Sequence, residues 1–184
     1  MKQAGREGFT LAEIVLGGML LSIALAAILG SYVGEVTLNE HARNLSLAIQ
    51  DANRVIEQIR QNNAACSPNP PLAQWPSGAS WDGWLNDPAA GGGKSLQPDP
   101  ANNELVVVTC QAQAGGAPVD CTAAGPDPLR VTVAVCWRHR GRIIGECAAN
   151  GAALQPDETV SVPNEDLDII QSPAMLTTLV TCRS

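Results

Sequence analysis

The hydrophobic pattern of this chain begins with a long apolar run and predicts an unusually long helix. After a short polar leader, the run starts at Phe9 and lasts to about Val33. That length meets the roughly 20 residues that a helix needs to cross a bilayer. No proline occurs before Pro68, so nothing in this part of the chain interrupts a helix. We therefore expect a helix from Phe9 to about Asn62, about 80 Å long at about 1.5 Å per residue.

The second half of this helix, residues 34–63, is amphipathic. Its apolar residues are spaced by four and three positions in turn: Leu38, Ala42, Leu45, Ile49, Ala52, Ile56 and Ile59. This spacing places them in one stripe along a helix. The opposite side carries charged residues: Glu40, Arg43, Asp51, Arg54, Glu57 and Arg60. We expect the stripe to pack on the chain's own domain, and a self-associating coiled coil is the lesser alternative.

The C-terminal part of the chain has strand patterns. Residues Leu129–Arg138 alternate between apolar and other side chains without error, which predicts a half-buried strand. Three more segments have strand or hairpin character: Glu104–Cys110, Ile143 and Ile144 after a turn around Gly141, and Met175–Arg183. The predicted fold class is α+β, with the long helix packed on an antiparallel sheet of about four strands.

A long stretch between the helix and the first strand, residues 64–103, is rich in proline and is predicted to be irregular. It contains three of the four tryptophans, Trp75, Trp81 and Trp84. We expect them to fold back onto the sheet as cover. The alternative is an exposed contact surface for a neighbouring subunit or ligand, because tryptophan is favoured at interface hot spots.

Six cysteines follow the apolar run: Cys66, Cys110, Cys121, Cys136, Cys147 and Cys182. An even number in a domain beyond a membrane segment predicts disulfides in an oxidising compartment. A zinc site is disfavoured, because no Cys-x-x-Cys pair is present and both histidines lie apart from the cysteines. Six cysteines allow about 15 pairings, and the sequence does not choose among them.

Charge and motifs exclude several classes of function. The net charge of −7 argues against a nucleic-acid partner, which would need clustered Lys and Arg. No Ser or Cys nucleophile is set beside His41 or His139 and an acid in a recognisable pattern, so we expect no enzyme activity.

Two segments resemble ligand-binding motifs, but neither fits its motif. The segment Gly91-Gly92-Gly93-Lys94-Ser95 resembles the end of a phosphate-binding loop, but Pro88 stands where its first glycine belongs. The acidic segment Asn164–Asp168 offers oxygen ligands for calcium, but its spacing matches no calcium loop, and we expect a solvated loop. No cofactor is predicted.

One carboxylate, Glu13, lies inside the apolar run. Such a group costs about 2.5–3.5 kcal/mol at the centre of a membrane helix, so it usually has a partner. Together, Gly8, Phe9, Thr10, Leu11 and Glu13 with the apolar run resemble the processing site of type IV pilins and pseudopilins. This resemblance implies that a prepilin peptidase cuts between Gly8 and Phe9 and that the new Phe9 amine is methylated. It also implies that Glu13 meets the amine of a neighbouring subunit during assembly.

Two other interpretations of the N-terminal region remain open. One is a secretory signal cut near Ala24-Leu25-Ala26, and the other is an uncleaved single-span anchor. Both leave Glu13 without a role.

The resemblance implies a domain organisation and a function. Residues 1–8 would be a leader, 9–33 a transmembrane and filament-core helix, 34–63 its amphipathic continuation, and 64–184 a disulfide-bonded head. The chain would be a structural minor pilin or pseudopilin of a type IV pilus or a type II secretion pseudopilus, acting in assembly, in initiation or at the tip. Its partners would be the prepilin peptidase, the inner membrane and other pilin subunits. Its head would lie in the periplasm and, after assembly, in an extracellular filament.

A finer placement rests on two short segments. Cys136-Trp137-Arg138 and Leu176-Thr177-Thr178 resemble segments of the PilV-like minor pilins and the I-type pseudopilins. Two other classes stay open: a membrane-anchored adhesin or ligand-binding module that uses the Trp-rich loop, and a secreted enzyme with a conventional signal.

Overall fold

The computed structural model describes residues 10–63, 80–96, 99–112, 118–119, 121, 128–156 and 172–181. The chain divides into two compact units, Met1–Ala42 and Arg43–Ser184, and each is considered by itself. Several residues singled out by the sequence lie outside the described residues: Gly8, Phe9, Cys66, Trp75, Cys182 and the acidic segment Asn164–Asp168.

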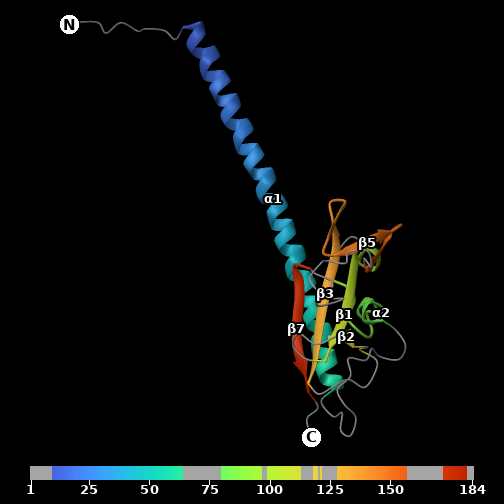
Figure 1. The fold of residues 1–184 in the computed structure, drawn as a ribbon. Coiled ribbons are helices and arrows are strands. Elements are labelled where there is room, and N and C mark those ends of the chain that lie inside the picture. Colours follow the sequence, from blue (N-terminus) through green and yellow to red (C-terminus); the bar gives the residue numbers. More distant parts are fainter. Residues whose placement is uncertain are drawn as a thin grey trace, which may run out of the picture. The chain divides into compact units, whose positions relative to one another are not determined.

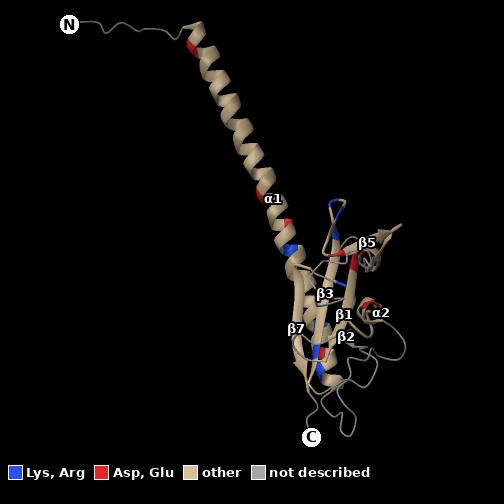
Figure 2. Ribbon diagram, in the orientation of Figure 1, with Lys and Arg blue, Asp and Glu red and all other residues tan. Residues whose placement is uncertain are grey.

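The predicted long helix is confirmed as α1, Leu11–Asn62, a single helix of 52 residues (Figure 1). In the first unit its large apolar side chains are exposed, and Glu13 is the one charged residue between Leu11 and Gly34 (Figure 2). This stretch is long and apolar enough to cross a membrane. Three hydroxyl side chains bond within the helix: Ser22, Ser31 and Thr37 donate to the carbonyl oxygens four residues earlier at 2.8, 3.2 and 3.0 Å. Such internal bonding is what hydrocarbon surroundings require.

The second unit contains an antiparallel sheet built around one long strand, β3. The strands of the main sheet are β1 (Glu104–Gln111), β2 (Pro118–Val119), β3 (Leu129–His139), β4 (Arg142–Ile144) and β7 (Ala174–Val180). β1 pairs with one edge of β3 and β2 with the end of β1. β7 and β4 share the other edge of β3, with β7 along Leu129–Val135 and β4 along Trp137–His139.

The predicted hairpin between β3 and β4 is present. Arg140 and Gly141 have φ angles of 49° and 78°. Two consecutive residues with positive φ are what a two-residue I′ turn requires, and glycine adopts this conformation without a Cβ penalty.

The core lies between α1 and one face of the sheet. From α1 it takes Ala48, Ala52, Val55, Ile56 and Ile59, and from β3 it takes Leu129, Val131, Val133, Val135 and Trp137. The predicted apolar stripe is therefore confirmed from Leu45 onward, whereas Leu38 and Ala42 in the first unit are exposed. One residue assigned to the polar side of the helix is in the core: Asp51 is fully buried.

Both faces of β3 are buried, so the prediction of a half-buried strand is wrong. Thr132, Ala134 and Cys136 on its second face are almost fully buried. A separate hairpin, β5 (Cys147–Asn150) and β6 (Ala153–Pro156), is joined to this face by a disulfide from Cys136 to Cys147. The sequence did not predict this hairpin.

The proline-rich region is less irregular than predicted. It contains α2 (Trp81–Asn86) and α3 (Pro100–Asn103). Ser80 caps α2 by accepting a hydrogen bond from the Gly83 amide at 3.0 Å, the common role of serine at a helix start. Trp81 and Leu85, four positions apart, are buried in the core. α2 contacts β1, where the Asp82 carboxylate accepts from the Val106 amide at 2.9 Å.

Candidate functional site

The start of the apolar helix is the first candidate site, and it forms a capping box. Glu13 Oε2 accepts from the Thr10 backbone N–H at 2.9 Å and from the Thr10 hydroxyl at 3.0 Å. In return, the Glu13 N–H donates to Thr10 Oγ1 at 3.3 Å. Threonine followed three residues later by glutamate is the sequence signature of this motif. In the single chain, therefore, the carboxylate expected to meet a neighbour's amine is bound by its own first helical turn.

This capping box predicts a local effect of changing Thr10. Thr10→Val removes the hydroxyl that both donates and accepts, and should destabilise the first turn by about 1 kcal/mol, whereas Thr10→Ser retains the hydroxyl. Amide hydrogen exchange of the first turn, measured on the detergent-solubilised chain, should be about fivefold faster in the valine variant. Equal exchange in both variants would contradict a capping role.

The exposed part of α1 also carries a row of small residues. Gly18, Ser22, Ala26, Gly30 and Gly34 recur at every fourth position. A Cβ added at any of the three glycines would meet nothing within 4 Å, so no contact within this chain requires glycine there. In lipid, small residues at this spacing let helix backbones approach closely. The row is therefore a surface on which another helix can pack.

The second candidate site lies inside the second unit and connects α1, α2, the following loop and β1. We call it the buried polar cluster. Its members are Asp51 and Arg54 of α1, Asp82 of α2, Lys94 and Ser95 of the loop, and Glu104 of β1.

The α1 side of the buried polar cluster is centred on Asp51. Its Oδ2 accepts from the Ser95 amide at 2.8 Å, and its Oδ1 accepts from the Ser95 hydroxyl at 2.7 Å and from Arg54. Arg54 also donates to the Gly91 carbonyl oxygen at 2.8 Å and to the Ser95 hydroxyl at 2.9 Å. A fully buried carboxylate is tolerated only with such donors, and here they come from its own helix and from the loop.

The β1 side of the buried polar cluster is centred on Lys94, whose side chain is only 1% exposed. Its ammonium group lies 2.8 Å from Asp82 Oδ1 and donates to the Glu104 carbonyl oxygen at 2.7 Å. Lys94 therefore joins α2 to the start of β1. With Lys94 and Ser95 bound inside the fold, this glycine-rich segment has no phosphate-binding geometry.

The glycines before Lys94 allow the loop to come this close. A Cβ on Gly91 would lie 2.5 Å from both the Leu85 Cα and the Trp84 carbonyl oxygen. Gly92 has a φ of 84°, in the left-handed region, and a Cβ there would lie 2.9 Å from Arg54 Nη1. The glycine run is therefore explained by close packing against α2 and the Arg54 side chain.

Glu104 lies in an environment that disfavours its charged form. Burial, followed by a hydrogen bond to Asp51 and the charge of Asp51, raises the pKa of Glu104 to about 9. The Leu96 amide and the Lys94 charge act in the opposite direction but are outweighed. The Leu96 amide donates to Glu104 Oε2 at 3.4 Å, while Oε1 is buried without a donor. The raised pKa favours the protonated acid at neutral pH.

Two of the three tryptophans that the sequence singled out can be placed. Trp81 is buried in the core, and Trp84 is partly buried against it. Their rings meet edge to face, with 5.4 Å between centroids. Trp81 and Trp84 thus lie against the core of the second unit. The Trp81 side chain is only 1% exposed, so it offers no contact surface.

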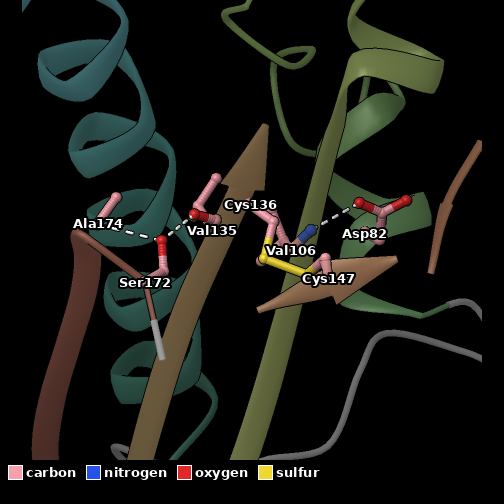
Figure 3. The surroundings of a disulfide bond; sticks show 7 residues. All are labelled: Asp82, Val106, Val135, Cys136, Cys147, Ser172 and Ala174. Carbon is pink, nitrogen blue, oxygen red and sulfur yellow. Dashed lines mark hydrogen bonds between the residues drawn. A yellow bond between two sulfur atoms is a disulfide. The ribbon is translucent and has the colours of Figure 1, made fainter. Parts of the chain in front are cut away.

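Within the described part of the chain, two disulfides pair four cysteines. Cys110 is bonded to Cys121, and Cys136 is bonded to Cys147. Figure 3 shows the second bond joining β3 to β5, beside the hydrogen bond from the Ser172 hydroxyl to the Val135 carbonyl oxygen. If all six cysteines are bonded, as the sequence predicts, only Cys66 and Cys182 are left to pair.

Sequence reasoning missed the buried polar cluster. It placed Asp51 on the solvent side, since charged residues on an amphipathic helix are normally exposed. The sequence signal for this cluster is the glycine run before Lys94 and Ser95, which by itself resembles only part of a phosphate-binding loop. Among the described residues, no group of His, Cys, Asp and Glu side chains could hold a metal ion.

No protein-family model, curated protein or solved structure matches this chain.

Proposed function

We propose that this chain is a structural subunit of the pilin type, anchored in the inner membrane by the apolar part of α1. A prepilin peptidase would cut between Gly8 and Phe9, and the mature chain would join other pilin subunits in a type IV pilus or a type II secretion pseudopilus. The observation that carries this proposal is an exposed apolar helix with a single carboxylate, Glu13, at its start.

Two further features support the proposal. The row of small residues from Gly18 to Gly34 suits close packing between helices in lipid or in a filament core. The second unit is a disulfide-bonded α+β domain in which α1 packs on the sheet, the arrangement expected of a pilin head. In this role the protein acts by packing, and the buried polar cluster keeps the head in one conformation.

The mature N-terminus tests the proposal. The full chain, expressed in membranes together with a prepilin peptidase, should yield a protein that begins with methylated Phe9 when examined by mass spectrometry. A Gly8→Val variant, which places a branched side chain at the cut, should keep its leader and serves as the matched control. An intact Met1 in the wild-type protein would indicate a simple anchor, and a start near residue 27 would indicate a secreted protein; either result would overturn the proposal.

A further inference from the structure

We propose that Asp51 and Glu104 form a proton-operated latch, which holds the loop of residues 87–96 and strand β1 on helix α1 while one proton is shared between the two carboxyl groups. Loss of that proton would place two negative charges side by side in the core and loosen the loop. This inference does not depend on the proposed function.

The hydrogen bonds show which carboxyl group needs the proton. Asp51 already accepts from the Ser95 amide, the Ser95 hydroxyl and Arg54. Glu104 has one donor, the Leu96 amide on Oε2, and its buried Oε1 has none. A proton on Glu104 supplies the missing hydrogen bond by donating to Asp51, which also raises the pKa of Glu104.

The latch has structural consequences because its partners come from three separate parts of the chain. Ser95 is bound to α1 through Asp51, and Leu96, the next residue, is bound to β1 through Glu104. Lys94 binds α2 and β1 through Asp82 and the Glu104 carbonyl oxygen. Opening the carboxyl pair would therefore loosen a loop segment that connects α1 to β1 by polar bonds.

The charged groups around the pair are unevenly distributed. Arg54 of α1 lies on the Asp51 side, and Lys94 of the loop lies beside Glu104 with Asp82 of α2 as its own counter-charge. Trp137, the partner of Glu104 in β3, carries no titratable group. The positive charge of Lys94 is thus shared with Asp82, which leaves burial and Asp51 to keep the proton on Glu104.

The direction of the pH effect follows from the raised pKa. The unfolded chain releases the Glu104 proton near its ordinary pKa of 4.5, whereas the folded chain holds it up to about pH 9. The stabilisation is therefore complete below the ordinary pKa and is lost progressively as the pH rises through the folded value.

The test is a pH titration of the full chain in detergent, monitored by tryptophan emission. This signal is suitable because Trp81 and Trp84 lie on α2 beside the loop. The wild-type protein should show a transition with a midpoint near pH 9, and its melting temperature should fall between pH 5 and pH 9. Glu104→Gln, which can donate to Asp51 without titrating, should lack the emission transition and should have a flatter melting profile. Glu57→Gln, an exposed change on α1, should behave as the wild type.

A second variant tests whether the transition belongs to the pair of carboxyl groups. Asp51→Asn removes the charge that keeps the proton on Glu104 and should move the emission midpoint to lower pH. The same wild-type midpoint in Glu104→Gln would assign the transition to another group and overturn the proposal. An unmoved midpoint in Asp51→Asn would overturn the pairing of the two carboxyl groups.

Discussion

Glu13→Ala should be cut and methylated like the wild-type chain and then be almost absent from filaments. In the proposed assembly, the Phe9 amine of one subunit meets the Glu13 carboxylate of another within lipid or a dry filament core. Removing one partner of a buried ion pair typically costs about 3–5 kcal/mol, because the other charge is left uncompensated. We therefore expect incorporation to fall on the order of a hundredfold or more, measured by immunoblotting of sheared filaments from the native host.

The capping box makes this experiment sharper, because the cap formed by Glu13 can be separated from its proposed role in assembly. Glu13→Gln keeps an oxygen that can accept from Thr10 but removes the charge, so it should assemble as poorly as Glu13→Ala. Thr10→Val weakens the cap but retains the carboxylate, so it should still assemble. Glu35→Ala, a change outside the apolar run, is the control for removing a glutamate from α1. Normal incorporation of Glu13→Ala would remove the proposed role of Glu13 in assembly.

The cap and the proposed assembly contact use the same Glu13 carboxylate, and in the proposed order of events the cap forms first. A carboxylate in lipid needs hydrogen-bond donors at every stage, and among the described residues of the single chain these are the Thr10 amide and hydroxyl. An incoming amine would have to compete with these hydrogen bonds or share the carboxylate with them. Since capping groups leave part of a carboxylate's acceptor capacity unused, sharing is chemically reasonable.

The helix and the sheet could be predicted because their signals are local. The 3.6-residue stripe and the two-residue alternation can each be recognised within one continuous stretch of sequence. The elements that these patterns predict are present as α1, β1, β3, β4 and β7. The β5–β6 hairpin carries no such signal, with only four residues in each strand. A disulfide attaches it to β3, and the pairing of the cysteines could not be derived from their spacing alone.

The candidate site was harder to predict because its chemistry is non-local. Thr10 and Glu13 are three residues apart, and their proximity follows from helix geometry. The contacts of Asp51, by contrast, depend on Ser95, which is 44 residues away, and on Glu104, which lies in a strand. Burial of a carboxylate also contradicts the usual placement of charge on a helix, so only the tertiary structure identifies it.

Removal of either described disulfide is expected to cause a large change in the stability of the second unit. Each joins cysteines 11 positions apart, so each closes a loop of the same size. In the chain-entropy view, such a loop contributes about 3 kcal/mol. Removing either bond by a pair of Cys→Ala changes should lower the unfolding free energy by about this amount, measured by urea denaturation of the detergent-solubilised chain.

Equal loop length makes each disulfide a control for the other, and we expect the Cys136–Cys147 bond to have the larger effect. That bond attaches the β5–β6 hairpin to the second face of β3, where Arg138 adds hydrogen bonds of 3.1 and 3.5 Å to the Gly151 and Ala153 carbonyl oxygens. Without the bond, the hairpin should separate more readily and expose this face of β3. Hydrogen exchange should then increase in Cys147–Pro156 when Cys136 and Cys147 are replaced, and should stay unchanged there when Cys110 and Cys121 are replaced. The same exchange pattern in both variants would mean that the hairpin is held by its packing rather than by the disulfide.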